Sequence, residues 1–288
     1  MSSSGMAPAP APAPGPAVDA TVDDLAAVAF ASQLAGRRLA PVTVVIAAYN
    51  EEEGIAGVLR AIPSTICGLA VDTIVVVDGA TDATSDVARR CGVLVCDVEV
   101  NRGQGAALRL GYRLARQNGA DYIATTDADG QYDPAQLPLV VAPLVEGRAD
   151  FVTGSRRLGD THTTDRFRAA GVVVFAALIS VLTGQRITDP AYGMRAMRAE
   201  VTAAVDLQQP QYQATELLIG VAQRGYRVIE VPATMFPRAA GSTKKGGNFS
   251  YGIRVGRVIL GTWWRGRRSA RVRHGSLEGA SGSGAGEG

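Results

Sequence analysis

Ile123-Ala-Thr-Thr-Asp-Ala-Asp-Gly-Gln-Tyr-Asp-Pro134 joins a short apolar run to an acidic turn, and this junction is the most informative feature of the chain. Asp127 and Asp129 lie two residues apart on a turn with a glycine. Carboxylates with this spacing at the end of a strand can converge on one hard cation such as Mg²⁺, and Gln131 can add a neutral oxygen ligand. Asp, Gly and Pro are also ordinary turn residues, so the segment alone is compatible with a metal site or with a plain turn.

Around this segment, short apolar runs alternate with longer amphipathic ones. Runs rich in Val or Ile predict strands at Val42–Ala48, Thr73–Val77, Val93–Val98, Tyr122–Thr126 and Phe151–Thr153. Start and stop signals predict helices at Glu51–Ala61, Thr81–Arg90 and Gln104–Gln117. The alternation predicts an α/β protein with a Rossmann-like, mostly parallel sheet flanked by helices.

A polar cluster follows each of the predicted strands. The five clusters are Ala48-Tyr-Asn-Glu51, Asp78-Gly-Ala-Thr-Asp82, Asn101-Arg-Gly-Gln-Gly105, Asp127-Ala-Asp-Gly-Gln131 and Gly154-Ser-Arg-Arg157. Because ligands of open parallel sheets bind outside the carboxyl ends of the strands, we expect one site for a polar, phosphate-bearing ligand. The chain has no GxxxxGK[ST] motif, and its Gly-Gln-Gly lacks the third glycine of GxGxxG, which argues against kinase-type and dinucleotide chemistry.

Bulk composition narrows the function classes further. The 288 residues are 47% hydrophobic, enough for the core of one large or two ordinary domains. A net charge of +2 is too mild to indicate a nucleic-acid partner. The three cysteines, Cys67, Cys91 and Cys96, form no metal-type CxxC spacing, which fits small core residues in a reducing compartment.

Taken together, the clusters resemble the family 2 glycosyltransferases, most closely the branch of polyprenyl-phosphate sugar transferases that includes dolichyl-phosphate mannose synthase. The most specific segments are Asp127–Pro134, Asn101–Arg109 and Thr188–Arg195. The resemblance implies the nucleotide-sugar fold called GT-A. It also implies Mg²⁺ or Mn²⁺ on the diphosphate of a UDP- or GDP-sugar, with Asp127, Asp129 and Gln131 as the metal and diphosphate site.

By the same resemblance, further residues would bind the donor. These expected donor contacts are Ala48, Tyr49, Asn50, Glu51, Asp78, Arg102, Gly103, Arg238 and Lys244. Asp78 would face the base or ribose and Arg102 the pyrophosphate. The family often has Asp-Asp-Gly-Ser where this chain has Val77-Asp-Gly-Ala80, which leaves the identity of the base open.

The expected reaction is a single displacement with inversion at the anomeric carbon. A phosphate monoester is already an anion at pH 7 and needs positioning by cations rather than a general base. Arg156 is the expected acceptor contact, so a polyprenyl phosphate is the first candidate acceptor. If the acceptor is instead a hydroxyl, Asp189 would be the base; its other expected role is capping or pairing with Arg195. A third hypothesis is a nucleotide-sugar-binding module without catalysis.

The sequence predicts four parts. Residues 1–36 comprise a disordered Ala/Pro-rich segment, to about residue 20, and a lead-in helix; residues 37–250 form the GT-A domain, 251–274 a basic amphipathic helix and 275–288 a disordered tail. We expect a cytoplasmic protein, because the N-terminus lacks a secretory signal and the apolar stretch 169–184 is too short to span a membrane.

The amphipathic stretch 251–264 is compatible with peripheral contact with the inner face of the plasma membrane. The stretch 251–264 places Ile253, Gly256, Ile259, Leu260 and Trp263 on one helical side, flanked by arginines. Such a helix can lie in the headgroup layer of an anionic membrane or pack on the domain with an exposed basic end.

Overall fold

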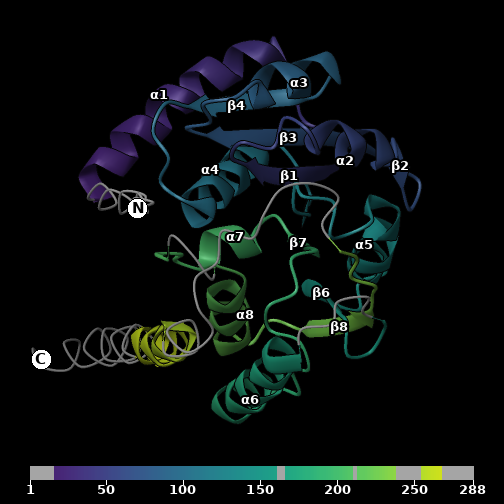
Figure 1. The fold of residues 1–288 in the computed structure, drawn as a ribbon, viewed down its shortest axis with the longest axis vertical. Coiled ribbons are helices and arrows are strands. Elements are labelled where there is room, and N and C mark those ends of the chain that lie inside the picture. The colour runs from purple at the N-terminus through teal and green to yellow at the C-terminus, as the bar shows by residue number, and fades with distance from the viewer. Residues whose placement is uncertain (1–15, 161–165, 210–212, 238–253, 268–288) are drawn as a thin grey trace, which may run out of the picture.

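A computed structural model describes residues 16–160, 166–209, 213–237 and 254–267. Within these residues the chain forms one mixed sheet with helices on both faces (Figure 1). The strands are β1 (Val42–Ala48), β2 (Thr65–Ile66), β3 (Leu69–Asp78), β4 (Leu94–Val98), β5 (Tyr122–Thr125), β6 (Phe151–Ser155), β7 (Arg195–Arg198) and β8 (Val228–Pro232). The predicted α/β class is confirmed.

The strand order is β2-β3-β1-β5-β7-β6-β8, with β4 also paired to β3. The central strand β1 runs parallel to β3 and β5, and β4 runs parallel to β3. The later strand β7 lies antiparallel between β5 and β6, while β8 is parallel to β6. The carboxyl ends of β1, β3, β4, β5 and β6 therefore share one edge, and the amino-terminal end of β7 lies at that same edge.

Helices fill the connections and cover the two faces. They are α1 (Pro16–Leu34), α2 (Ile55–Ala61), α3 (Thr84–Arg90), α4 (Gln104–Gln117), α5 (Leu137–Val145), α6 (Arg166–Thr183), α7 (Val201–Ala204) and α8 (Gln213–Gln223), with a short 3-10 turn at Pro134–Gln136. Strand side chains alternate between two cores, as β3 illustrates. Ile74 and Val76 belong to the core that includes side chains of α1, α4 and α8, and Val75 and Val77 to the core that includes side chains of α2 and α5.

Helix α1 belongs to the core of the domain, where it lies along β4 (Figure 1). Phe30 is 1% exposed. The Gln33 side chain bonds both backbone groups of Val95 in β4, at 2.7 Å to the carbonyl and 3.1 Å from the amide. The helix begins at Pro16, whereas the sequence predicted disorder up to about residue 20, so that prediction was wrong for residues 16–20.

A last helix over residues 254–267 packs on the domain, as one of the two sequence-based alternatives for this segment expects. Ile259, a member of the expected interfacial stripe, is fully buried. The Trp263 indole donates to the Leu182 carbonyl of α6 at 3.0 Å, and Gln223 of α8 donates to the Trp263 carbonyl at 2.9 Å. Two residues of the expected stripe, Ile259 and Trp263, thus face the protein, whereas a third, Leu260, is exposed.

Across the described part of the chain, no helix combines the length and the apolar composition that crossing a bilayer requires. The cysteines are all unpaired thiols. Cys96 is buried, and burial raises its pKa to about 12. Cys67 is exposed, contrary to its expected core position.

Candidate active site

The first two polar clusters are joined directly by hydrogen bonds. Asn50, which has a positive φ of 53°, accepts from the Thr81 amide at 2.8 Å. The Glu51 amide donates to the Thr84 hydroxyl at 2.9 Å. Ala48 is the buried last residue of β1, and Tyr49 beside it is 36% exposed. The loops after β1 and β3 are therefore joined to each other and form one rim at this edge of the sheet.

The third cluster is tied to the second by Asp78. Its Oδ2 accepts the amides of Arg102 at 2.8 Å and Gly103 at 2.6 Å, and the residue is only 2% exposed. The Arg102 side chain is 1% exposed and lies 2.7 Å from Oδ1 of Asp23 in α1. This burial is at odds with a direct contact of Arg102 with the pyrophosphate and of Asp78 with the base or ribose. Both residues instead shape the loop that carries Gly103.

The acidic turn follows β5, and residues from two other segments contact it. Asp129 is buried and its Oδ1 accepts the Gln131 amide at 3.0 Å. The Gln104 side chain donates to Oδ1 of Asp127 at 3.0 Å. A Cβ built on Gly193 would lie 2.8 Å from Oδ2 of Asp127, so the backbone before β7 also closes on this carboxylate.

The turn fits a partial metal site. Within the described ranges, no group of three His, Cys, Asp or Glu residues lies close enough to hold a metal ion alone. Two carboxylates that share the ion with substrate phosphates and waters are the usual arrangement for Mg²⁺, so this donor set suits an ion that arrives with a diphosphate.

Tyr132 connects the turn to the other half of the edge. It is 4% exposed and its ring meets that of Tyr192 edge-on, with centroids 4.7 Å apart. Burial raises the pKa of the Tyr132 phenol, and the charge of Asp127 raises it further. The phenol therefore stays neutral beside the acidic turn.

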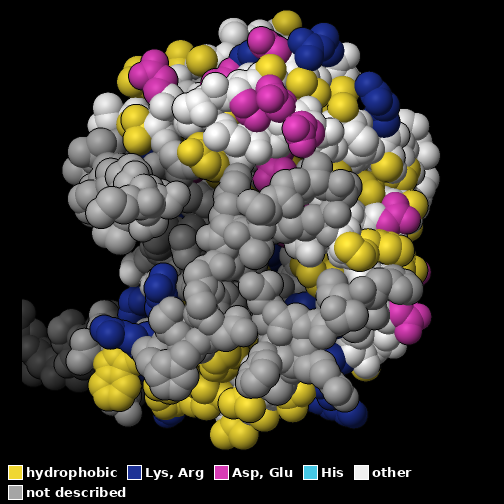
Figure 2. Space-filling model, viewed as in Figure 1, with side chains coloured by type: hydrophobic (Ala, Val, Ile, Leu, Met, Phe, Trp, Pro, Cys, Tyr) yellow, Lys and Arg dark blue, Asp and Glu magenta, His cyan; other side chains and the backbone are white. Residues whose placement is uncertain are grey.

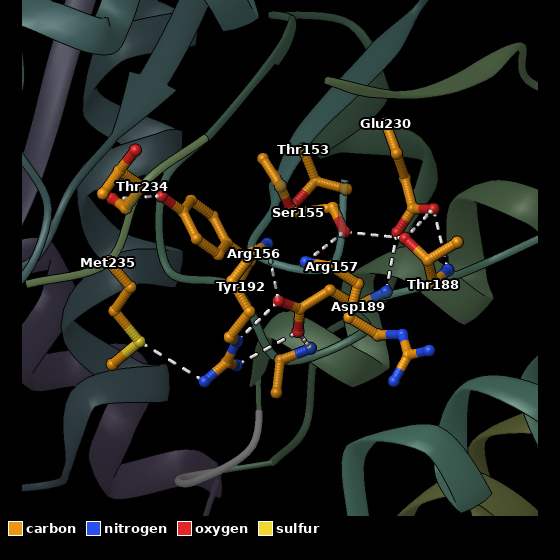
Figure 3. Close-up of polar contacts among 12 residues, drawn as sticks. Thr153, Ser155, Arg156, Arg157, Thr188, Asp189, Tyr192, Glu230, Thr234 and Met235 are labelled. Carbon is orange, nitrogen blue, oxygen red and sulfur yellow. Dashed lines mark hydrogen bonds and ion pairs between the residues drawn. The ribbon is translucent and has the colours of Figure 1, made fainter. Parts of the chain in front are cut away.

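Arg156 and Asp189 form the centre of the second half (Figure 3). The Asp189 carboxylate is fully buried and accepts from the Arg156 guanidinium at 2.6 and 3.1 Å. Burial alone would lower the pKa of Arg156, but the hydrogen bonds and charge of Asp189 outweigh burial and raise it. The guanidinium also contacts the Met235 sulfur at 3.3 Å. It is thus a fixed cation whose side chain is still 19% exposed.

Glu230 is a structural residue of the site that sequence reasoning missed. From β8 it accepts the amides of Thr188 at 2.7 Å and Asp189 at 2.9 Å (Figure 3). The Thr188 hydroxyl lies 2.7 Å from that of Ser155, at the end of β6. Glu230 therefore fixes the segment that presents Asp189 to Arg156. No motif marks it, because it lies mid-strand in an otherwise apolar run.

Arg195 was also expected to pair with Asp189, but it is buried at the start of β7. It is 3% exposed and donates to the Gly193 carbonyl at 3.2 Å and towards Gln213 at 3.5 Å. The expected donor contacts Arg238 and Lys244 lie outside the described residues.

The five clusters thus meet at one edge of the sheet, with carboxylates on one side and a fixed arginine on the other. The family model for glycosyl transferase family 2 matches residues 43–205, more than half of the chain. The chain belongs to glycosyl transferase family 2. This family 2 chain is accordingly a glycosyltransferase, and the resemblance seen in its motifs is confirmed.

Among curated proteins, this family 2 chain is 36% identical to a dolichyl-phosphate hexose transferase of Haloferax volcanii, over 75% of the chain and 91% of the relative. It is 29% identical to an undecaprenyl-phosphate mannosyltransferase of Micrococcus luteus, over 79% of the chain and 98% of the relative. A similar solved structure is glucosyl-3-phosphoglycerate synthase of Mycobacterium tuberculosis in complex with Mn²⁺, UDP and phosphoglyceric acid. Its TM-score is 0.62 at 23% identity, with 82% of each chain covered. This last likeness establishes the shared GT-A fold.

Proposed function

We propose that this glycosyltransferase moves a sugar from a UDP- or GDP-sugar to a polyprenyl phosphate, with inversion at the anomeric carbon. The observation that carries the proposal is Arg156, a partly exposed cation fixed by the buried Asp189 across the sheet edge from the acidic turn. The proposal is further supported by the names of the two curated relatives, both of which are polyprenyl-phosphate sugar transferases.

On the donor side, Asp127, Asp129 and Gln131 would hold Mg²⁺ or Mn²⁺ with the diphosphate. A bound divalent ion supplies Lewis-acid stabilisation of the departing diphosphate. The Gln104 side-chain amide donates to Oδ1 of Asp127 and orients this carboxylate. The other oxygen, Oδ2, lies beside the backbone of Gly193. Asn50 and Glu51 would contribute to the nucleoside pocket through the rim they form with the loop after β3.

On the acceptor side, a phosphate oxygen would attack the anomeric carbon directly. The phosphate is anionic at neutral pH, so the protein must position it and need not remove a proton. Arginine matches phosphate oxygens with two parallel donors, and Arg156 is held ready by Asp189. A single displacement of this kind inverts the anomeric configuration.

The alternative acceptor is a hydroxyl group, for which Asp189 would have to act as general base. Its two oxygens are taken up by the Arg156 guanidinium, and it is fully buried. Because both oxygens face the guanidinium inside the protein, neither is placed to meet a hydroxyl acceptor. The geometry therefore favours the phosphate acceptor.

The helix 254–267 and α6 expose a surface that is both basic and apolar. We propose that this surface contacts the cytoplasmic face of a membrane, where the protein would bind a lipid-linked acceptor. The helix 254–267 turns Leu260, 52% exposed, and Trp264, 56% exposed, away from the domain. Exposed arginines lie on the same side, at Arg254, Arg257 and Arg267. In α6, Val174 and Val181 are 63% and 82% exposed.

This surface is visible along the lower margin of the molecule, where hydrophobic side chains gather with basic ones beside them (Figure 2). The α6 helix and the helix 254–267 are in contact through Trp263 and Leu182. Trp and Leu flanked by arginines suit the headgroup layer of an anionic membrane. We therefore include peripheral contact with such a membrane in the proposal.

The test is transfer of labelled sugar from UDP- and GDP-sugars to polyprenyl phosphate, with Mg²⁺ or Mn²⁺ and with a chelator. We expect a metal-dependent lipid-linked monosaccharide of inverted configuration. Asp127→Asn should abolish it, whereas Asp133→Asn, in the same turn but bonded to the Ala135 amide, should retain it. Turnover by Asp127→Asn in metal-free buffer would refute the metal role. Donor hydrolysis without lipid product would discard the phosphate acceptor.

A further inference from the structure

Arg102 is a buried cation held by a carboxylate from outside the part of the chain that the family model matches. Its guanidinium Nη2 lies 2.7 Å from Oδ1 of Asp23, in helix α1. Its Nε lies 3.8 Å from Oδ1 of Asp78, at the end of β3. The family match begins at residue 43, so α1 is an addition to the matched domain.

Asp23 is the closer carboxylate of these two. Asp78 directs its other oxygen, Oδ2, to the amides of Arg102 and Gly103. A buried guanidinium costs free energy unless it is paired and hydrogen-bonded. The short contact with Asp23 therefore stabilises the inward position of the Arg102 side chain, which is 1% exposed.

The loop that Arg102 anchors leads directly to the acidic turn. Gly103 follows with a φ of +92°, and the next residue, Gln104, donates to Asp127. The loop is also wedged against β3, because a Cβ on Gly79 would lie 2.3 Å from the Asn101 amide nitrogen. With the backbone fixed on that side, the inward side chain of Arg102 fixes the direction in which Gln104 leaves the loop.

We propose that Asp23 is a positioning residue of the donor site, acting through Arg102 to hold Gln104 on Asp127. Helix α1 thereby sets the affinity of the site for the nucleotide diphosphate without touching it. The inference rests on the proposed function only in that the acidic turn binds a nucleotide diphosphate with a metal ion; it is independent of the acceptor.

Asp24 provides a matched control, because it is the next residue of α1 and also pairs with an arginine. Its side chain is 71% exposed and its partner Arg113 belongs to the middle of α4. The experiment compares Asp23→Asn, Asp23→Glu and Asp24→Asn with the unchanged protein. Binding of UDP and GDP with Mn²⁺ is measured by calorimetry, and hydrogen exchange of the Arg102 and Gly103 amides is measured without ligand.

We expect Asp23→Asn to raise the nucleotide Kd roughly tenfold, a fraction of the effect of breaking a buried ion pair, and to speed exchange of both amides. Asp23→Glu should recover most of the affinity, and Asp24→Asn should match the unchanged protein. The proposal is overturned if Asp23→Asn binds and exchanges as the unchanged protein does, or if Asp24→Asn shows the same loss. It is also overturned if Asp23→Asn lowers Tm without faster exchange at Arg102 and Gly103.

These readouts separate this inference from the acceptor assignment. A protein that binds nucleotide with Mn²⁺ but transfers no sugar to polyprenyl phosphate would refute the proposed acceptor. The comparison between Asp23 and Asp24 would still be decisive in that protein, because neither measurement uses the acceptor.

Discussion

Gly193 shows how closely the backbone approaches the acidic turn. A Cβ at this position would lie 2.4 Å from Cε2 of Tyr132 and 2.8 Å from Oδ2 of Asp127. Both neighbours are held, Tyr132 by burial and Asp127 by Gln104. A methyl group could be accommodated only by displacing the carboxylate or the ring, since protein interiors are close-packed.

Gly193→Ala should therefore reduce sugar transfer at least 100-fold, because a small displacement of a positioned group has effects of that order. The change should appear in kcat with saturating donor and metal, measured by product formation. Gly57→Ala is the matched control, as its new Cβ would meet no atom within 4 Å. Wild-type turnover by Gly193→Ala would show that the backbone here has room to move.

The sequence predicted site residues at Asp127, Asp129, Arg156 and Asp189, because each lies in a motif or directly after an apolar run. It did not identify how they are held. Glu230 lies mid-strand, and Asp23 lies in a helix far from the motif it supports. Contacts of this kind depend on tertiary packing, which a single sequence does not display. The same limit explains Arg102, where a motif position expected to bind ligand is buried in an ion pair.

At the scale of elements, the insertion of β7 between β5 and β6 organises the edge. Because β7 runs antiparallel to both neighbours, the chain before it arrives where β5 and β6 end. The segment Thr188–Met194 thus brings Asp189 and Gly193 between the two halves of the site. Early strands and helices were predicted well, with β1 and α4 at the expected bounds. The strands β7 and β8 were not, since β7 carries two arginines and β8 includes Glu230.

Asp150 links β6, β7 and β8 at the edge of the sheet opposite the candidate active site. It accepts from Arg227, beside β8, at 2.8 and 3.0 Å, and lies 3.4 Å from Arg198 of β7. The hydrogen bonds from Arg227 are the main cause of a lowered pKa for the Asp150 carboxyl, and they outweigh burial. Because its folded pKa is lowered, its stabilising contribution is present above the ordinary Asp pKa and is lost as pH falls through the folded value.

Asp150→Asn should lower Tm by roughly 2–4 °C at pH 7. The difference should shrink as the pH falls below about 4, where this carboxyl takes up a proton in the unfolded chain, and should be lost below its lowered folded pKa. Thermal melts at several pH values test this, with Asp86→Asn as a control, since its side chain is 70% exposed and pairs with Arg89 within α3. A Tm difference that persists undiminished at pH 3 would contradict the ionic origin.

At the scale of the whole molecule, the apolar and basic surface of α6 and the helix 254–267 is the feature to test. Leu260→Ser combined with Trp264→Ser should weaken binding to anionic vesicles at least tenfold, because two large apolar side chains would no longer enter the headgroup layer. Vesicle sedimentation measures the partition. Binding should also fall with added salt and on neutral vesicles, because the arginines contribute by charge.

Leu139→Ser is the control for this pair, since Leu139 is 47% exposed but belongs to α5. Equal vesicle binding by the double variant and the unchanged protein would remove this surface from the proposal. The sequence left open whether the apolar side of the helix 254–267 packs on the domain or meets a membrane, and Leu260 of the expected stripe is exposed. Trp263 of that stripe packs on α6 and α8, and only the structure shows what remains outside.

The contact of Gln33 with β4 has a practical consequence for shortened versions of this protein. The family match begins at residue 43, which invites removal of everything before it. Gln33 satisfies both backbone groups of Val95 on the side of β4 that faces away from β3. Without α1, that side would present unpaired amides and carbonyls, which can recruit a strand from another molecule. A chain cut at the family boundary should therefore tend to self-associate in solution, and a start at or before Pro16 should avoid this.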